Sequence, residues 1–177
     1  MGYAVELHFD AAQATPIVRL TESIFAACGG LNLLEIGGAP HLSLVVMDEP
    51  DLTQLQAVLH RFATTLAPFA VTLAAVGSFP TEQGVIYLAP VVTQQLLQVH
   101  AHFHAQLAAV GLKSHGYYQP GHWVPHCTVG IDVPAAKVGE ALMRCRQADV
   151  FHTVTITSLR LIEFRPVREI LSLVIGD

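Results

Sequence analysis

One short pattern occurs twice in the chain and holds the side chains best suited to chemistry. The first copy is PHLSL at residues 40–44, and the second is PHCTV at residues 125–129. Both read Pro-His-x-(Ser/Thr)-apolar and run on into apolar, β-branched residues, which is typical of a buried strand. The two histidines, His41 and His126, are 85 positions apart.

Each copy places an imidazole beside a hydroxyl, because side chains on a strand alternate between two faces. His41 therefore shares a face with Ser43, and His126 with Thr128, while Cys127 points the other way. Imidazoles exchange protons near neutral pH, and hydroxyls donate to phosphate oxygens. Two such pairs facing each other predict a phosphate site with one histidine as acid and one as base. We expect Cys127 to be a small core residue rather than a nucleophile.

The elements that must position these residues repeat along the chain. Helical spacing, strand alternation and Gly or Pro punctuation predict the elements. In the first half they are a strand at 3–9, a helix from Asp10 to Gly29, a strand at 31–36, the first motif strand, a helix from Asp51 and a strand at 69–79. In the second half they are a strand at 84–89, a helix at 92–110, the second motif strand, a helix from Pro134 and strands at 152–164 and 170–175.

This repetition predicts an α+β fold with two pseudo-symmetric lobes from an internal duplication. We expect antiparallel sheets flanked by helices and a central cleft. The whole chain, 1–177, should form a single bilobal domain, with lobe one at about 2–83 and lobe two at about 84–177. His41 and His126 should then lie on central strands of separate lobes.

Composition narrows the classes of partner. Hydrophobic residues make up 52% of the 177 residues and charged ones 13%, which indicates a globular core. Charged or polar residues interrupt every apolar run, so we expect no membrane partner. The formal net charge of −5 argues against an extended nucleic-acid footprint, but a small phosphate ester, a nucleotide or an RNA end remains compatible. Three cysteines without a Cys-x-x-Cys pair fit a cytoplasmic location.

The chain resembles the two-histidine (2H) phosphoesterases, and among them the 2′-5′ RNA ligase and RNA 2′,3′-cyclic phosphodiesterase group. The resemblance rests on the two His-x-(Ser/Thr)-apolar motifs, one in each half, and covers nearly the whole chain. It implies a phosphodiesterase of RNA processing that acts on a 2′,3′-cyclic phosphate or a 2′-5′ linkage with no metal or other cofactor. His41 and His126 would be acid and base in an order that stays open, and Ser43 and Thr128 would hold phosphate oxygens.

A non-catalytic module that binds nucleotides or RNA ends on the same fold is the alternative function. Two intact motifs favour the enzyme, because a binding module needs no acid–base pair. Turnover of 2′,3′-cyclic nucleotides separates the two functions.

Three other groups of residues are weaker site candidates. The run from His100 to His104 looks like the core of histidine-triad nucleotide hydrolases, but apolar residues at helical spacing predict a helix with partly exposed histidines and no metal site. The aromatic residues before the second motif could stack on a base or pack as a loop at the cleft rim; they are Tyr117, Tyr118, His122 and Trp123. Arg165 and Arg168 are interpreted as solvated turn charges.

Overall fold

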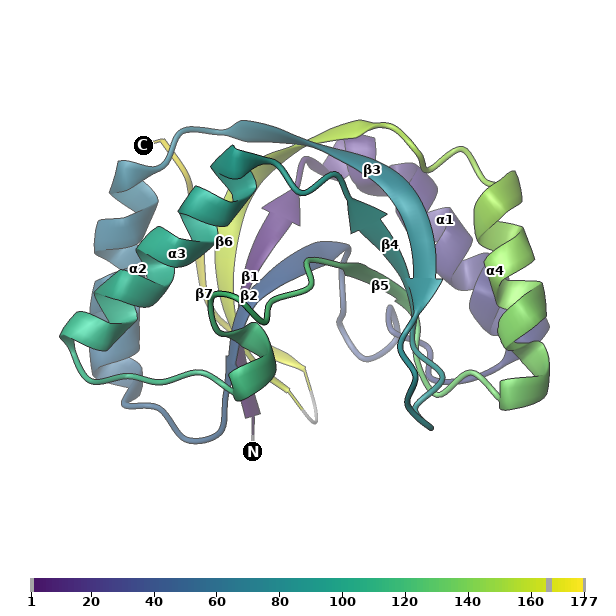
Figure 1. Ribbon diagram of the computed structural model, residues 1–177, viewed down its shortest axis with the longest axis horizontal. Helices are drawn as coiled ribbons and strands as arrows, with labels where there is room; N and C mark the ends of the chain where they lie inside the picture. Colours follow the sequence, from purple (N-terminus) through teal and green to yellow (C-terminus); the bar gives the residue numbers. More distant parts are fainter. Residues whose placement is uncertain (1, 165–166, 177) are drawn as a thin grey trace.

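The computed structural model describes residues 2–164 and 167–176. Within these ranges seven strands form one sheet, which arches between two pairs of helices (Figure 1). Helix α1 packs with α4 at one end and α2 with α3 at the other. In chain order the elements are β1 (Gly2–Phe9), α1 (Ala11–Cys28), β2 (His41–Met47), α2 (Leu52–Thr65), β3 (Phe69–Ser78), β4 (Ile86–Pro90), α3 (Gln94–Ala109), the 3₁₀ helix η1 (Gly116–Tyr118), β5 (Cys127–Gly130), the 3₁₀ helix η2 (Ala135–Lys137), α4 (Val138–Gln147), β6 (Thr153–Phe164) and β7 (Arg168–Val174).

The strands pair antiparallel in the order β2-β1-β6-β3-β4-β5, and β7 also pairs with β6. The predicted α+β class with antiparallel pairing is confirmed. Strand β1 pairs along one edge of the long strand β6. On the other edge, β3 pairs with the first residues of β6 and β7 with the later ones. Strands from the two sequence halves thus share one sheet, and the division into lobes at about 2–83 and 84–177 stays a prediction.

Local sequence signals account for the helices. The side chains of Asp10 and Asp51 accept hydrogen bonds from the backbone N–H groups of Gln13 (3.1 Å) and Gln54 (3.0 Å), as expected of N-cap residues. The inward face of α1 is apolar and buried, so burial of that face against the sheet stabilises the helix. No helix within the described ranges is long and apolar enough to cross a membrane.

The strand expected at residues 31–36 is wrong, because this segment forms a turn. The side chain of Asn32 accepts hydrogen bonds from the backbone N–H groups of Leu34 (3.2 Å) and Glu35 (3.4 Å). Gly37 then takes a positive φ of 89°, which glycine adopts without steric cost. These local bonds satisfy the backbone within the turn, so the apolar residues around it do not join the sheet.

The motif strands lie at the two ends of the strand order, so their expected central position is wrong. Among the described strands, β2 pairs only with β1, and β5 pairs only with β4. The free edge of β2 receives donors from the second half of the chain instead of another strand. The indole Nε1–H of Trp123 donates to Ser43 O (3.0 Å), and the backbone N–H of His115 donates to Val46 O (2.8 Å). The segment before the second motif is therefore docked on the strand that carries the first.

Candidate active site

The first motif forms the start of β2. Buried and half-buried residues alternate along this strand, with Leu42 and Leu44 fully buried and His41 and Ser43 half-buried. The alternation matches the prediction that the histidine and the hydroxyl share a face. The His41 side chain keeps 25% of its surface exposed, so a substrate can reach it.

The second motif has the same layout around the start of β5. His126 directly precedes the strand, Cys127 is fully buried, and Thr128 is half-buried. Burial raises the pKa of the Cys127 thiol to about 12, and the thiol lies against the backbone of His41. Cys127 is thus a core residue, as expected, and it packs where the two motif strands approach each other.

Both histidines are anchored in the same way. Nδ1 of His41 lies 2.7 Å from the carbonyl oxygen of Ala39, and Nδ1 of His126 lies 2.7 Å from that of Val124. A carbonyl oxygen only accepts, so Nδ1 carries a proton in both rings. The bonded carbonyl lies two residues before each histidine, across a proline whose φ is fixed. Each motif therefore fixes Nδ1 by its own backbone, so that the ring makes its other contacts through Nε2.

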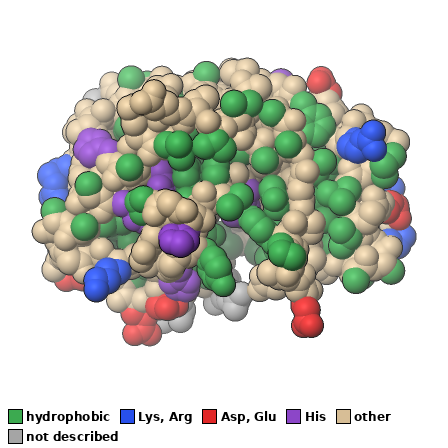
Figure 2. All heavy atoms as spheres, in the orientation of Figure 1, with side chains coloured by type: hydrophobic (Ala, Val, Ile, Leu, Met, Phe, Trp, Pro, Cys, Tyr) green, Lys and Arg blue, Asp and Glu red, His purple; other side chains and the backbone are tan. Residues whose placement is uncertain are grey.

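The two motif strands, β2 and β5, contact each other. Burial lowers the pKa of His126, and the charge of His41 lowers it further. Figure 2 shows hydrophobic side chains around a hollow in the middle of this face, with Lys, Arg, Asp and Glu toward its edges. Apolar surroundings of this kind lower the local dielectric constant and strengthen the electrostatic interactions of groups within them.

A cavity of about 650 Å³ opens beside the second motif and includes His126 and Thr128 in its wall. The other described residues of the wall are mainly apolar, aromatic or neutral, with no lysine or arginine among them: Phe79, Pro80, Thr81, Gln83, Val85, Tyr117, Tyr118, His122, Trp123, Val124 and Ile131. His41 and Ser43 are not part of that wall. The structure thus places the second motif on the cavity and the first motif beside it.

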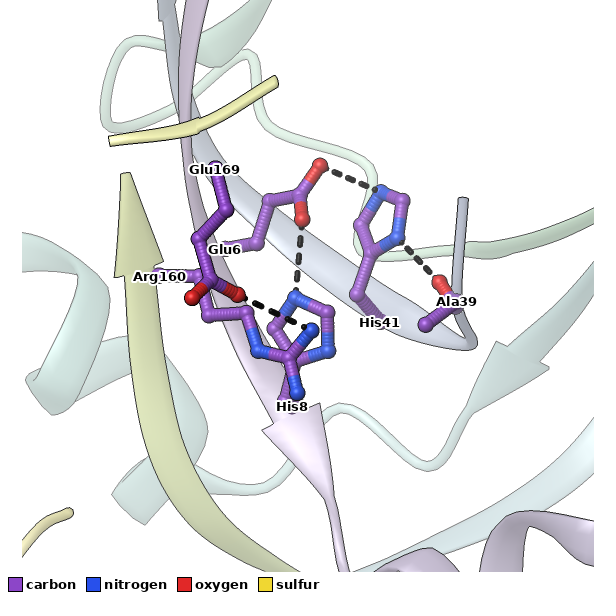
Figure 3. Close-up of polar contacts among 6 residues, drawn as sticks. All are labelled: Glu6, His8, Ala39, His41, Arg160 and Glu169. Atoms are coloured by element: carbon purple, nitrogen blue, oxygen red, sulfur yellow. Dashed lines mark hydrogen bonds and ion pairs between the residues drawn. The ribbon is translucent and has the colours of Figure 1, made fainter. Parts of the chain in front are cut away.

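A buried polar cluster lies next to His41 and escaped the sequence analysis (Figure 3). Glu6 and His8 on β1 are both 4% exposed. His8 Nε2 donates to Glu6 Oε2 (2.8 Å), while the other carboxylate oxygen, Oε1, lies 3.2 Å from His41 Nε2. The sequence did contain a signal for this cluster. Glu6 and His8 are polar residues two positions apart in an otherwise apolar strand, so their side chains lie on the same face.

This cluster is also the group in the described part of the chain that could in principle hold a metal ion. Ligand atoms of Glu6, His8 and His41 all lie within 4.8 Å of one another. Arg160 on β6 is the cross-strand neighbour of Glu6, and its positive charge lowers the pKa of both Glu6 and His8. That charge disfavours a cation. In addition, the hydrogen bond between Glu6 and His8 already occupies two of the atoms that would have to bind the metal. We therefore interpret the cluster as a hydrogen-bonded network.

Of the α3 histidines that the sequence predicted to be partly exposed, His102 is exposed and His104 half-buried, but His100 is buried, so the prediction is wrong for His100. His100 is only 2% exposed, its ring stacks on Trp123 at 4.0 Å, and its Nε2–H donates to Tyr118 O (2.8 Å). Burial lowers the pKa of His100 to about 4. Nε2 of half-buried His104 faces Leu44 O on β2 at 3.4 Å. These side chains hold the aromatic loop and the first motif strand together.

The remaining candidates divide between the cavity and the surface. All four aromatic candidates belong to the cavity wall: Tyr117, Tyr118, His122 and Trp123. Tyr118 and Trp123 are half-buried, and the Trp123 ring packs on α3, so these two form a packed rim. Tyr117 and His122 are exposed, and stacking on a base stays a prediction. The Arg168 guanidinium pairs with Glu163 at 2.8 Å, which fits a turn charge. Arg165 lies outside the described residues.

The fold and the paired motifs define a class of protein, and comparisons with known proteins identify its family. A family model described as the 2′-5′ RNA ligase superfamily matches residues 37–167, well over half of the chain. The chain therefore belongs to the 2′-5′ RNA ligase superfamily. The resemblance to the 2H phosphoesterases that the motifs indicated is confirmed.

Individual relatives agree with this assignment. A protein of Bacillus mycoides (strain KBAB4), named as a presumed phosphoesterase, is 26% identical over 129 residues, which are 70% of this chain and 69% of that protein. The solved structure of TT0787 from Thermus thermophilus matches with a TM-score of 0.72 at 18% identity, over 99% of this chain and 98% of that one. E. coli LigT matches with a TM-score of 0.67 at 16% identity and the same coverage. Family and fold together support a phosphoesterase or 2′-5′ RNA ligase-like activity.

Proposed function

We propose that the protein is a metal-independent phosphodiesterase that acts on 2′,3′-cyclic phosphates of nucleotides or RNA ends, or on 2′-5′ phosphodiester linkages. The observation that carries the proposal is the matched anchoring of two histidines. Each Nδ1–H is bonded at 2.7 Å to the carbonyl two residues earlier, so each ring presents Nε2 as its reactive nitrogen. Two such rings supply both proton transfers that opening a phosphodiester requires.

Ser43 and Thr128 are proposed to hold the phosphate. Each follows its histidine by two residues on the same strand face, and both are half-buried. Hydroxyl groups in that position can donate to the non-bridging oxygens as negative charge builds up on them. In this proposal His41 and His126 transfer protons, while Ser43 and Thr128 stabilise the charge.

The substrate is proposed to be small. Solved structures of E. coli LigT contain 3′-AMP, NADP+, ATP or phosphate, and these ligands indicate the chemistry that the fold accommodates. The cavity beside His126 has aromatic and neutral walls, which suit a nucleoside better than a run of phosphates. The net charge of −5 also argues against a long nucleic-acid footprint. A cytoplasmic location, proposed from the cysteines, fits three free and buried thiols.

A substrate panel tests the proposal. Purified protein is incubated with 2′,3′-cyclic mononucleotides, 2′-5′ dinucleotides and oligonucleotides that end in a cyclic phosphate, each with and without EDTA. We expect turnover of at least one class at a rate that EDTA does not change. Binding of nucleotides without turnover of any substrate would instead establish the non-catalytic module. Activity that EDTA abolishes would contradict a metal-independent reaction.

A further inference from the structure

The symmetry between the two motifs is broken on the strands that pair with them. In the β1–β2 register Glu6 lies opposite Ser43, and in the β4–β5 register Tyr87 lies opposite Thr128. Tyr87 therefore occupies in the second half the position that Glu6 occupies in the first. The first motif has a buried carboxylate beside its histidine, whereas the second has a phenol ring at the matching position.

We propose that Glu6 is a positioning residue that keeps His41 protonated, so that His41 is the general acid and His126 the general base. The assignment rests on the function proposed above and adds the direction of proton transfer. Both nitrogens of His41 face acceptors, with Nδ1 2.7 Å from Ala39 O and Nε2 3.2 Å from Glu6 Oε1. A carbonyl and an ionised carboxylate only accept, so a ring that donates to both of them carries protons on both nitrogens.

His8 holds the carboxylate in this role. Its Nε2–H donates to Glu6 Oε2 at 2.8 Å, which fixes the carboxylate orientation and leaves Oε1 toward His41. Burial lowers the pKa of His8, so His8 is a neutral donor. Burial alone would raise the pKa of Glu6, but the charge of His41 and the hydrogen bond from His8 outweigh it and hold that pKa below its ordinary value. Glu6 is therefore ionised at neutral pH.

Other charges around the cluster leave this pairing intact. Arg160 lies across the strand from Glu6, and its guanidinium pairs with Glu169 of β7 at 3.2 Å. The positive charge of Arg160 adds to the lowering of the pKa of both Glu6 and His8, which favours an ionised Glu6 and a neutral His8. Burial raises the pKa of Tyr118, and its phenol stays neutral. In the described part of the chain, the titratable or charged groups around the Glu6–His41 pair are His8 on β1, Arg160 on β6 with its partner Glu169 on β7, and Tyr118, His126 and Cys127 from the second half.

His126 has the opposite surroundings. The rings of Phe79 and Tyr87 approach it edge-on, with centroids 4.9 and 5.5 Å away. Among the described residues no carboxylate lies within ion-pair distance of it. Burial lowers the pKa of His126. With Nδ1–H bonded to Val124 O, its Nε2 is left with a free lone pair, which is the state that a general base needs.

These roles fix the direction of proton transfer during the reaction. As the oxygen of a water bonds to the phosphorus of a 2′,3′-cyclic phosphate, His126 Nε2 takes a proton from that water. The bond from phosphorus to one ribose oxygen breaks, and that oxygen receives the proton of His41 Nε2. The products are a phosphomonoester and a free hydroxyl, and proton exchange with solvent restores both rings. A contact of 3.2 Å is at the long end of the hydrogen-bond range, so Glu6 holds the Nε2 proton of His41 only weakly and the proton can pass to the leaving oxygen.

The kinetic test compares Glu6→Gln with Glu163→Gln, which makes the same chemical change elsewhere in the sheet. Glutamine keeps an acceptor for His8 but removes the charge beside His41. Because the acid must be protonated, loss of its charge partner should move the basic limb of the kcat/KM profile to lower pH. Glu163 pairs with Tyr3 and Arg168, and its variant should leave that limb in place. An unmoved basic limb in Glu6→Gln would overturn the proposal.

Nitrogen NMR of the histidine rings tests the same assignment without turnover and without any variant. At neutral pH we expect His41 to be protonated on both nitrogens and His126 on Nδ1 only. The reverse pattern would overturn the proposal, and so would a stoichiometric divalent ion in the native protein that Glu6→Gln releases. A protein that opens no phosphodiester but shows the expected ring states would contradict the proposed function and leave the role of Glu6 standing.

Discussion

His126 should set the acidic side of the pH dependence. Its pKa is lowered by burial and by the charge of His41. A general base works only when neutral, so the rate should fall as pH drops through the pKa of His126. Because that pKa lies below the ordinary imidazole value of about 6.5, the acidic limb of kcat/KM should lie below pH 6.5. An acidic limb at or above the ordinary value, measured on a cyclic mononucleotide, would contradict this assignment.

The hydroxyls of Ser43 and Thr128 should matter as hydrogen-bond donors rather than as packing groups. Thr128→Val keeps the shape of the side chain and removes its donor, so we expect kcat to fall about ten- to a thousand-fold, by analogy with the loss of an oxyanion donor. Thr128→Ser keeps the donor and should retain most of the rate. Ser43→Ala should resemble Thr128→Val. Full kcat in the valine variant, in a steady-state assay, would show that Thr128 does not hold the phosphate.

The four motif residues could be predicted from sequence because strand alternation is a local property. His41 and Ser43 indeed lie on the half-buried face of β2, as expected from their spacing of two. Glu6 could not be assigned in the same way. Its place beside His41 depends on the register between β1 and β2, which is set by pairing across more than 30 residues of chain.

Helix α3 was predicted from its apolar periodicity, but its contacts were not. His100 faces inward because Tyr118 and Trp123 of the following loop fold back over the helix. Helical periodicity reports the face of a helix that is apolar, whereas a polar residue packed under a distant loop leaves no periodic signal. The segment at 31–36 was mispredicted for a similar reason. Its apolar residues suggested a strand, but the hydrogen bond that the Asn32 side chain accepts from the Leu34 N–H favours a local turn.

The packing of His100 makes a prediction about stability. Its pKa is about 4 in the folded protein and about 6.5 in the unfolded chain. As pH falls, the unfolded state therefore binds the proton before the folded state does. The contribution of neutral His100 to the free energy of unfolding is complete above about pH 6.5 and is lost toward pH 4. Each pKa unit is worth about 1.4 kcal/mol, so the loss approaches about 3 kcal/mol.

Chemical denaturation at pH 7 and pH 4.5 checks this prediction. His100→Gln should lose less unfolding free energy between the two pH values than the native protein does, because its side chain does not titrate. His102→Gln is the matched control, since His102 is exposed on the same helix. An identical pH dependence in native protein and His100→Gln would contradict the linkage.

The molecule as a whole brings its two motifs together through the curvature of one sheet. β2 and β5 are at opposite ends of the strand order, yet Trp123 beside the second motif donates to Ser43 in the first. Sequence repetition could predict the antiparallel α+β class, because both halves have the same order of elements. It could not predict the strand order, since many orders satisfy the same local patterns and only long-range contacts select one.

A mutant cycle on His41 and His126 tests most directly whether the two motifs form one catalytic site. The variants His41→Ala, His126→Ala and the double variant are assayed for kcat on the best cyclic mononucleotide, with EDTA present. Each single variant should lose about 10²–10⁴ in kcat, the usual contribution of a positioned acid or base. The double variant should lose far less than the product of the two, because residues that act as a unit are not additive. Losses that multiply, or activity that survives in His126→Ala, would contradict a shared site.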